Sequence, residues 1–234
     1  MQISPVGFVR SPYKQKFAIP RQPGLVGEAV GEIIFAESCA NPNCLREIEQ
    51  FSHLWILFQF HETAEKGWAP TVQPPRLGGR KKVGVFASRS TFRPNGIGLS
   101  VVTNRGWFQQ GGELILRVGG IDLLDETPII DIKPYLPYAD CIEDAAAGYA
   151  EAVPGENYSV IFTPDAEQFL TSVLAEHPEL RKLITGVLKQ DPRPAWRKKP
   201  KDEKTYGMEL FDINIKWRID KEEITVFQIE KTEN

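Results

Sequence analysis

Short apolar runs, each bounded by glycine, proline or asparagine, recur through the first 150 residues and constrain the fold more than any other feature. The runs read VGFV, GEIIF, LWILFQF, VGVFA, IGLSVV, ELILRV and PIIDI. Runs of this length between such residues are typical of strands, and no regular helical pattern alternates with them. The sequence therefore predicts a mainly β structure, a barrel or sandwich, rather than alternating β-strands and α-helices.

One short helix is expected in this β region, in the segment NPNCLREIEQF. Asn41 can cap its first turn, and Pro42 fits the position that follows the cap. Leu45 and Ile48 lie three residues apart, which puts them on the same side of a helix.

The sequence changes character near residue 150. AAAGYAEAVPGEN is typical of a boundary, so we expect a larger β domain over residues 1–150 and a small α+β domain over residues 151–234. Thr163 and Pro164 suit an N-cap and a first helical turn, and a second helix is expected from His177 and Pro178. The expected apolar faces are Phe169, Leu170, Val173 and Leu174 in the first helix and Leu180, Leu183, Ile184, Val187 and Leu188 in the second.

A basic segment and a hairpin are expected after the helices. DPRPAWRKKPKDEK is typical of a proline-braced loop, and FDINIKWRI and ITVFQIE are typical of two strands joined by a polar turn. The inward face of the first strand, at a period of two, comprises Phe211, Ile213, Ile215, Trp217 and Ile219.

Charge is segregated along the chain. The net charge of −3 by itself argues against a nucleic-acid partner, yet residues 66–112 contain no acidic residue and eight basic ones. Residues 113–167 then contain twelve acidic residues and two basic ones. Such segregation creates local fields that the total hides. The basic stretch is either a solvated loop surface or a site for an anionic ligand or nucleic acid.

Several classes of protein are not indicated. The longest apolar run, LWILFQF, is too short to span a bilayer, and the first residues do not resemble a signal peptide. The three cysteines form no CxxC motif, which favours structural thiols in a reducing, cytoplasmic setting. The three separated histidines predict no metal site. The motifs GxxxxGK[ST], GxGxxG between strand and helix, and GxSxG are absent.

Polar joints between the expected strands remain as candidates for a site. They are FAIPRQPGLV, FHETAEKGWAP, FASRSTFRPNGIGLS and GIDLLDETPIIDIKPYLPYAD. Proline fixes φ, and glycine lets a ligand approach the backbone closely. Arg89 can bind a carboxylate, a phosphate or a base edge, or form a structural ion pair. The aspartates of the last joint can accept ribose hydroxyls or cap turns.

The order of five segments makes the pattern specific. GFVRSPYKQKFAIPRQPGLV, FSHLWILFQFHE, VGVFASRSTFRPNGIGLS, DLLDETPIIDIKPYLPYAD and QDPRPAWRK together closely resemble the TsaA/TrmO family. The resemblance covers nearly the whole chain, including the C-terminal domain of the bacterial branch. It implies an S-adenosylmethionine-dependent tRNA methyltransferase whose cofactor domain is a β-barrel outside the Rossmann class. It also implies a homodimer with the cofactor near the subunit interface.

The resemblance further implies a substrate and a set of site residues. The substrate is N(6)-threonylcarbamoyladenosine at position 37, in the anticodon loop of threonine tRNA, methylated at N(6). The implied cofactor contacts are Gln22, Pro23, Gly24, His61, Glu62, Arg89, Leu99, Ile121, Asp122, Leu123 and Leu124. This chain departs from many members at Glu62, where they have glutamine, and at Gly96, where they have a second proline.

Basic and acidic side chains are the remaining candidates for contacts with the RNA and the proton. We expect tRNA contacts at Arg10, Arg93, Arg193, Arg197 and Lys198, because phosphates are bound by lysine and arginine. Trp196 either stacks on a base or packs on the helices. The acceptor of the N(6) proton stays open among Asp122, Asp125, Asp131 and Glu62. The cationic partner of the threonyl carboxylate stays open among Arg10, Arg89 and Arg93.

Two other functions compete with tRNA methylation. A β-barrel that binds nucleic acid without catalysis has the same segregated charge but no affinity for S-adenosylmethionine. A methyltransferase for a small metabolite has that affinity but does not need the basic residues of the C-terminal domain.

Overall fold

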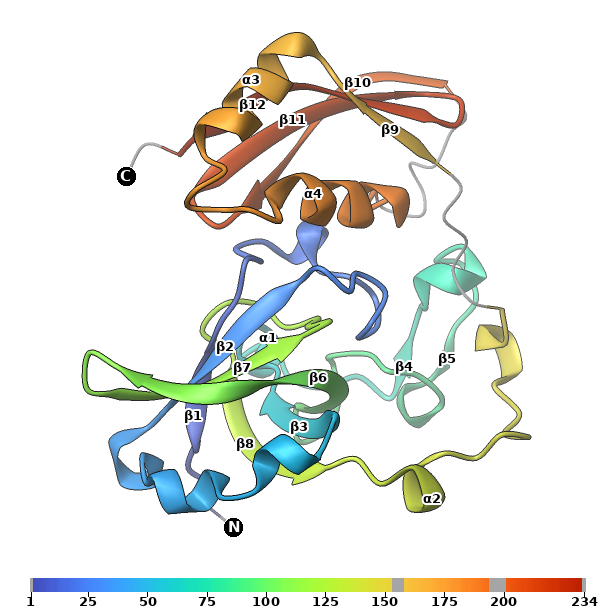
Figure 1. The fold of residues 1–234 in the computed structure, drawn as a ribbon. Coiled ribbons are helices and arrows are strands. Elements are labelled where there is room, and N and C mark those ends of the chain that lie inside the picture. Colours follow the sequence, from blue (N-terminus) through green and yellow to red (C-terminus); the bar gives the residue numbers. More distant parts are fainter. Residues whose placement is uncertain (1, 153–157, 194–200, 233–234) are drawn as a thin grey trace.

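The apolar runs of the N-terminal part form strands that close on themselves. The computed structural model describes residues 2–152, 158–193 and 201–232, and Figure 1 shows their arrangement. The six long strands are β1 (Gly7–Arg10), β2 (Val30–Phe35), β3 (His53–Gln59), β6 (Ile97–Gln110), β7 (Glu113–Gly119) and β8 (Pro128–Pro134). They pair in the order β1-β2-β7-β6-β3-β8, and because β1 also pairs with β8 the sheet is a closed barrel. The prediction of a mainly β chain is confirmed.

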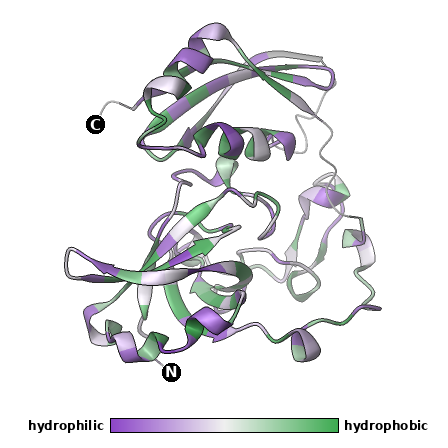
Figure 2. Ribbon diagram, viewed as in Figure 1, coloured by the Kyte–Doolittle hydropathy of each residue, from purple (hydrophilic) through white to green (hydrophobic). Residues whose placement is uncertain are grey.

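Period-two alternation explains which side chains fill the barrel. On β3, Leu54, Ile56 and Phe58 are at most 5% exposed, whereas Trp55 and Leu57 between them are only partly buried. Successive residues of a strand point to opposite faces of the sheet, so the first set faces the interior and the second faces outward. Figure 2 shows the hydrophobic residues concentrated along the barrel strands.

The antiparallel pairing brings three connections to one end of the barrel. Each strand of the closed order runs opposite to its neighbours, so β1, β3 and β7 run in the same direction. The segments that follow them, residues 11–29, 60–96 and 120–127, therefore emerge together. We call these three segments the loop end of the barrel.

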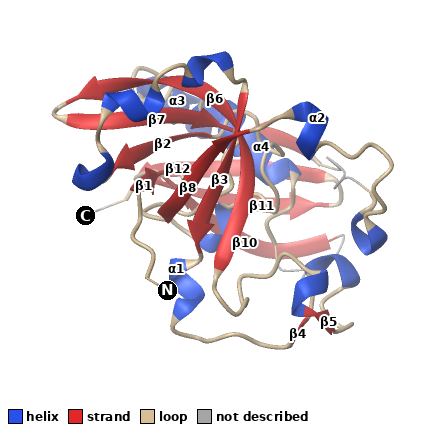
Figure 3. Ribbon diagram, turned by 90° about the horizontal axis from the view of Figure 1, so that it is seen from below, coloured by secondary structure: helices blue, strands red, loops and turns tan. Residues whose placement is uncertain are grey.

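The longest of these connections carries its own small elements. It contains α1 (His61–Ala64), the two-stranded sheet of β4 (Thr71–Val72) and β5 (Val83–Gly84), and the 3-10 turns η5 (Pro75–Leu77) and η6 (Val85–Ala87). Figure 3 shows β4 and β5 to one side of the barrel. The chain after β8, with α2 (Pro137–Asp140) and η7 (Gly148–Ala150), contacts this insertion, since the Tyr149 hydroxyl donates to Ala87 O at 2.9 Å and Arg76 donates to Ala152 O at 2.7 Å.

The helix expected in NPNCLREIEQF is not a single helix. After η2 (Glu37–Cys39), the segment forms two 3-10 turns, η3 (Pro42–Leu45) and η4 (Ile48–Gln50). The Asn41 cap is present, because its side chain accepts from Asn43 N at 3.0 Å. Glu47 between the turns has a φ of 65°, in the left-handed region, which breaks the helical path.

The C-terminal part is an α+β unit, with the two helices found where apolar periodicity predicted them. Its sheet has the order β10-β11-β12-β9, from β9 (Ser159–Phe162), β10 (Lys201–Leu210), β11 (Ile213–Asp220) and β12 (Glu223–Lys231). The helices are α3 (Pro164–Ser172) and α4 (Leu180–Lys189). Thr163 caps α3 as expected, accepting from Ala166 N at 3.5 Å. Leu174 lies beyond the end of α3 and is 57% exposed, so its expected place in the apolar face is wrong.

The expected C-terminal hairpin is part of this larger sheet. β11 and β12 pair as predicted, and Ile213, Ile215, Trp217 and Ile219 are buried. Phe211 instead occupies the turn before β11 with a φ of 57°. Residues 201–204, the end of the expected loop, are instead the start of strand β10, and β9 pairs parallel to β12. These pairings depend on distant segments, which the local pattern does not reveal.

The two parts share a continuous hydrophobic core. Tyr13, in the β1–β2 connection, forms an isolated β-bridge with Leu210 of β10. Gly186 of α4 lies against Val26, since a Cβ at position 186 would be 2.9 Å from Val26 Cγ1. The C-terminal unit is thus packed against the loop end, with α4 beside the β1–β2 connection (Figure 1). Among the described helices, none has the length and apolar character that a membrane span requires.

Candidate functional site

Two glycines bring the β1–β2 and β7–β8 connections into backbone contact. Gly24 N donates to Gly120 O at 2.9 Å. Both residues have positive φ, 75° at Gly24 and 67° at Gly120, a conformation that glycine adopts without strain. A Cβ at Gly120 would lie 3.2 Å from the Cα of Gly24. Only glycine therefore lets these two predicted cofactor segments approach so closely.

Arg89 links the β3–β6 connection to the β1–β2 connection. It is exposed, and its guanidinium donates to the side-chain oxygen of Gln22. Arg93 has a different role, because it donates to Ser88 O at 2.6 Å and to Val85 O at 3.4 Å. Arg93 thus holds the loop that carries Arg89. It remains partly exposed, so a contact with RNA is still a prediction.

Asp122 belongs to the β7–β8 connection of the loop end, and its carboxylate contacts a side chain of the barrel interior. The Ser100 hydroxyl, 2% exposed on β6, donates to Asp122 Oδ1 at 2.7 Å. Burial raises the pKa of Asp122 to about 6, against the opposing effects of the hydrogen bonds from Ser100 and from its own backbone N–H and of the charge of Arg89. Asp122 is partly exposed, so a ligand at the loop end can reach it.

Tyr13 places a buried hydroxyl in the same region. Its side chain is 0% exposed, and within the described part of the chain its hydroxyl has no hydrogen-bond partner. Burial raises its pKa, and the negative charges of Asp122 and Glu28 raise it further. Sequence reasoning missed Ser100 and Tyr13 as individual site residues. For Ser100 a signal was present, a hydroxyl at an inward position of an apolar strand.

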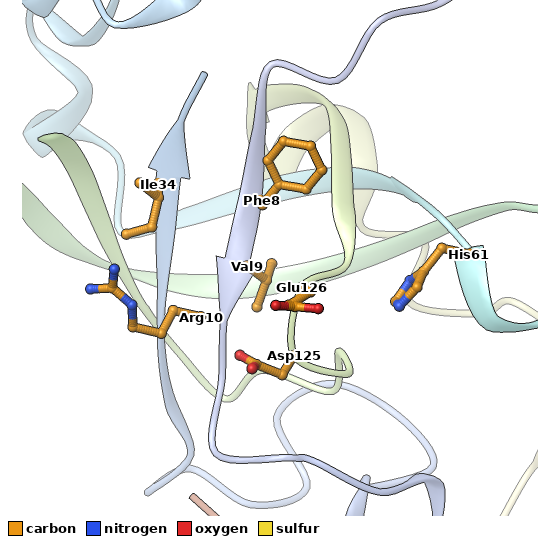
Figure 4. Close-up of a pocket in the computed structure, with 7 residues that line it drawn as sticks. All are labelled: Phe8, Val9, Arg10, Ile34, His61, Asp125 and Glu126. Atoms are coloured by element: carbon orange, nitrogen blue, oxygen red, sulfur yellow. The ribbon is translucent and has the colours of Figure 1, made fainter. Parts of the chain in front are cut away.

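An open pocket lies beside β1, next to Asp125 and Glu126 of the loop end (Figure 4). It has a volume of about 460 Å³ and is lined by Phe8, Val9, Arg10, Ile34, His61, Asp125 and Glu126. In Figure 4, Arg10 and Ile34 lie on one side of β1, and His61 lies on the other, beyond Asp125 and Glu126. Asp125 itself is engaged, because it accepts from Ser11 N at 2.8 Å and pairs with Lys14.

The remaining predicted cofactor residues differ in what they can offer. Ile121 and Leu123 are at most 2% exposed, so only their backbone can contact a ligand. Leu99 is 51% exposed and points out of the barrel, opposite to its neighbour Ser100. The side chains of His61 and Glu62 are 29% and 71% exposed, and they lie 3.9 Å apart. No hydrogen bond or ion pair of the described residues joins either to the Arg89–Gln22 pair.

The predicted tRNA contacts are dispersed. Arg10 is exposed on β1 but donates to Glu32 and Glu113 at 3.3 Å each. Arg193 is 2% exposed and pairs with the buried Asp191 at 2.8 Å. We therefore correct its expected role, since a buried and paired guanidinium does not face a phosphate. Arg197 and Lys198, like Trp196, lie outside the described residues.

Exposed cations are grouped on the β4–β5 insertion instead. Arg80, Lys81 and Lys82 are exposed, and no ion pair joins them to another residue in the described ranges. Those ranges also contain no group of histidine, cysteine and carboxylate side chains that could hold a metal ion. The three cysteines are free thiols.

Comparisons with known proteins agree with this arrangement. Residues 8–141 match the model of the tRNA-methyltransferase O N-terminal domain, and residues 155–232 match that of the TrmO C-terminal domain. A tRNA (adenine(37)-N6)-methyltransferase of Escherichia coli K12 is 48% identical over 98% of this chain and 97% of that protein. A putative S-adenosylmethionine-dependent methyltransferase of Pseudomonas aeruginosa is 44% identical over 92% of this chain and 91% of that protein.

Solved structures resemble the whole chain. The crystal structure of TrmO from P. aeruginosa has a TM-score of 0.79 and 38% identity, covering 98% of this chain and 97% of that one. A second crystal structure of TrmO from the same species has a TM-score of 0.78 and 37% identity, with 98% of both chains covered. Because both family models match in order and the likeness extends over barrel and C-terminal sheet alike, the chain belongs to the TrmO family.

Proposed function

We propose that this protein is an S-adenosylmethionine-dependent tRNA methyltransferase that acts on N6 of adenine 37. The observation that carries the proposal is the convergence of Gln22, Arg89 and Asp122 at one end of a barrel that belongs to the TrmO family. Relatives that match nearly the full chain bear the names of this activity and of this cofactor.

The finer substrate is N(6)-threonylcarbamoyladenosine in threonine tRNA, as the sequence resemblance implies. Its threonyl carboxylate needs a cationic partner in the site. Arg89 is the best placed of the three arginines considered, because Arg10 is paired with two glutamates and Arg93 is bonded to its own loop. A guanidinium binds a carboxylate through two parallel hydrogen bonds.

The residues of the loop end fit the proposed cofactor. The close approach of Gly24 to Gly120 leaves no side chain between these two segments, and glycine lets a ligand approach the backbone closely. Asp122 is partly exposed beside these segments, and Ser100 is the side chain of the described residues that donates to it. Gln22 and Arg89 supply donors at the rim. When bound, S-adenosylmethionine supplies a methyl group that its sulfonium already activates.

The protein's contribution to catalysis is then mainly positioning. The loop end must hold the target nitrogen in line with the methyl carbon and the sulfur, and must keep water out of the path. Such alignment can supply about 7–11 kcal/mol of the barrier reduction. Arg93, which braces the loop of Arg89, and the glycine pair of the other two connections stiffen the loops that do this.

Binding of the anticodon loop requires a basic surface next to the site. The exposed Arg80, Lys81 and Lys82 lie in the same connection as Arg89 and can bind phosphates. The C-terminal domain, residues 151–234, is proposed to contribute through Arg197 and Lys198. Single-stranded loops are read by stacking and by contacts to base edges, so the basic surface provides affinity rather than specificity.

The domain division, the assembly and the location remain part of the proposal. We infer a cofactor-binding barrel over residues 1–150 and a homodimer in the cytoplasm. In a dimer, some of the contacts to the cofactor come from the partner subunit. Leu99, exposed on the outer face of β6, is a predicted contact whose side chain points out of its own barrel.

Methyl transfer to defined RNA tests the function directly. The protein is incubated with radiolabelled S-adenosylmethionine and with threonine tRNA that carries the threonylcarbamoyl group, lacks it, or has another base at position 37. We expect label only in tRNA with adenosine at 37, and most in the threonylcarbamoylated form. Cofactor binding without transfer to any of these RNAs contradicts the proposal, and absence of cofactor binding favours a module that only binds nucleic acid.

A pair of arginine variants tests the site. Arg89→Gln removes the cation at the loop end, and we expect it to lower kcat/KM by about 10²-fold, the order of a lost hydrogen-bonded charge in a site. Arg117→Gln is the matched control, because Arg117 bonds Glu32 on the outer face of the barrel. Equal activity of both variants would rule out a role for Arg89 in the site.

A further inference from the structure

We propose that Asp122 accepts the proton that the target nitrogen loses during methyl transfer, and that Ser100 is the positioning residue that holds its carboxylate. The inference deepens the proposed function and rests on it. It assigns a proton acceptor that sequence reasoning left open among four carboxylates.

The reaction requires an acceptor for one proton. The N6 atom gains a bond to the methyl carbon and loses its bond to hydrogen, while the bond between carbon and sulfur breaks with its electron pair left on sulfur. The positive charge of the sulfonium disappears, and the proton neutralises one carboxylate. Atoms and charges balance when Asp122 Oδ2 receives this proton. The nitrogen is conjugated with the purine and the carbamoyl group, so removal of the proton assists its attack.

The structure argues against the three other carboxylates. Asp125 already accepts from Ser11 N and pairs with Lys14, so both of its oxygens are engaged. Asp131 accepts from Ile132 N at 2.9 Å through Oδ1, and its Oδ2 is 3.8 Å from Lys133, so both of its oxygens have partners. The Glu62 side chain is 71% exposed, which leaves it free to move in solvent.

Asp122 has the geometry of a fixed acceptor. Ser100 donates to Oδ1 at 2.7 Å, and Ser100 itself is 2% exposed on β6, so its hydroxyl has a rigid support. Besides Ser100, the backbone N–H of Asp122 itself hydrogen-bonds the carboxylate, and no other side chain of the described residues donates to it. The carboxylate is partly exposed at the loop end, where residues 22–24 and Arg89 meet.

The charged and titratable groups around Asp122 suit this role. Arg89, from the β3–β6 connection, carries the positive charge that favours the ionised form. Tyr13, from the β1–β2 connection, is held un-ionised by burial, and Glu28 acts on Tyr13 from the same connection. Burial outweighs Arg89 and Ser100 and sets the pKa of Asp122 to about 6. The group is thus ionised at neutral pH and still basic enough to take a proton, as an efficient general base must be.

Single-turnover kinetics with saturating cofactor and saturating threonylcarbamoylated threonine tRNA test the assignment. We expect Asp122→Asn to lower the rate of methyl transfer by about 10²- to 10⁴-fold. We expect its affinity for S-adenosylmethionine, measured by calorimetry, to stay within threefold of the wild type. Asp220→Asn is the matched control, a carboxylate-to-amide change at the exposed end of β11 in the C-terminal sheet, and should leave both quantities unchanged.

The pH profile provides a second readout. The wild-type rate should fall tenfold per unit below about pH 6, as Asp122 becomes protonated. Ser100→Ala removes a hydrogen bond that lowers this pKa, so the falling limb should move to higher pH while the plateau rate changes less. A Ser100→Thr variant, which keeps a hydroxyl, should restore the limb toward the wild-type position.

The outcomes separate the two proposals. A wild-type protein that binds the cofactor but labels no tRNA contradicts the proposed function. A wild-type protein that labels tRNA, with Asp122→Asn equally fast at saturation, overturns only the proton-acceptor assignment. Loss of cofactor affinity in Asp122→Asn with a normal rate at saturation shows that the carboxylate binds the cofactor instead. If Asp122→Asn does not fold, the pH profile of Ser100→Ala decides the question. A falling limb at the same pH as in the wild type overturns the inference.

Discussion

Arg89 and Arg93 stand four residues apart in the segment FASRSTFRPNGIGLS and have separate roles. Arg93 bonds the carbonyls of Ser88 and Val85 inside its own loop, whereas Arg89 reaches across to Gln22. Gly96, with a φ of 59°, closes the turn that returns the chain to β6, and its carbonyl accepts from Phe60 N at 2.7 Å. The loop is therefore a braced support that presents one arginine to the loop end.

The pH dependence of stability should report the unusual state of Asp122. Its native pKa of about 6 exceeds the ordinary value of 3.8, so the native state binds the proton more tightly. The free energy of unfolding then falls as pH rises from about 4 to 6, and the loss is complete above that range. We expect Asp122→Asn to be more stable than the wild type at pH 8, by about 1–3 kcal/mol. At pH 4 the difference should be small.

Urea unfolding of both proteins at pH 4, 6 and 8 provides the measurement. The quantity to compare is the difference in free energy of unfolding at each pH, because other carboxylates titrate in both proteins alike. A difference that does not change with pH shows that Asp122 has an ordinary pKa. A variant that is more stable yet inactive would be typical of a site in which function costs stability.

Gly98 is required by packing rather than by backbone conformation. A Cβ there would lie 2.3 Å from Cζ of Phe58, whose ring is 5% exposed and packs edge-on against Phe60. We expect Gly98→Ala to lower the free energy of unfolding by about 1–3 kcal/mol, because the ring has no room to withdraw. Gly84→Ala is the control, with open space around it and a φ of −59°. Chemical denaturation of both variants checks this, and equal stabilities refute the packing argument.

At the scale of elements, the end of α4 depends on a buried ion pair. Asp191 follows the helix with a φ of 47°, and its carboxylate accepts two bonds from the Arg193 guanidinium, at 2.8 and 3.1 Å. The Tyr158 hydroxyl also donates to Asp191 at 3.3 Å. This cluster ties the chain after α4 to the start of β9.

Removing one partner of that pair should be costly. We expect Arg193→Gln to lower the free energy of unfolding by about 3–5 kcal/mol, because it removes the guanidinium that forms a buried ion pair with Asp191. Arg181→Gln is the control, since Arg181 pairs with Glu167 on the surface with 55% of its side chain exposed. That change should cost about 1 kcal/mol or less. Guanidinium denaturation gives both values.

The same variants test the corrected role of Arg193. If Arg193 has only a structural role, the folded Arg193→Gln protein should show the same slope of tRNA affinity against salt concentration as the wild type. A phosphate contact would instead reduce that slope by about one. A stable Arg193→Gln protein with a reduced salt slope would restore the original expectation.

Elements with strong local signals formed where the sequence predicted them, whereas elements that depend on distant partners did not. Thr163–Pro164 started α3, and the alternation of Ile213, Ile215 and Trp217 formed β11. By contrast, β10 begins in a lysine-rich segment that has no strand periodicity of its own. It is a strand because it pairs with β11 over Tyr206–Leu210. In the segment after Asn41, left-handed Glu47 divided an expected helix into two turns.

At the scale of the whole molecule, the barrel and the C-terminal unit are joined by a shared core. The contacts are made by the β1–β2 connection, which also carries the predicted cofactor residues Gln22 and Gly24. Phe211 N donates to Pro12 O at 2.8 Å, and Gln15 donates to Glu209 at 3.0 Å. The C-terminal unit thus supports a loop of the proposed site from behind.

Calorimetry should therefore show one unfolding transition for the full chain. The coupling can be tested at Gly186, where alanine normally stabilises a helix by about 1 kcal/mol. A Cβ there would lie 2.9 Å from Val26, so we expect Gly186→Ala to lower the Tm instead. A double-mutant cycle with Val26→Ala provides the check. Gly186→Ala should cost less stability in the Val26→Ala protein than in the wild type. Two separate transitions in the wild type contradict a shared core.

The sequence by itself determined the mainly β class, the two C-terminal helices, the TrmO resemblance and the segments of the candidate site. These depend on local spacing and on motif residues, which are visible along the chain. Tertiary structure alone decided the order in which the barrel strands pair, the four-stranded C-terminal sheet and the burial of Arg193. It also singled out Asp122, because the hydrogen bond from Ser100 and the burial that raises its pKa come from residues far apart in sequence.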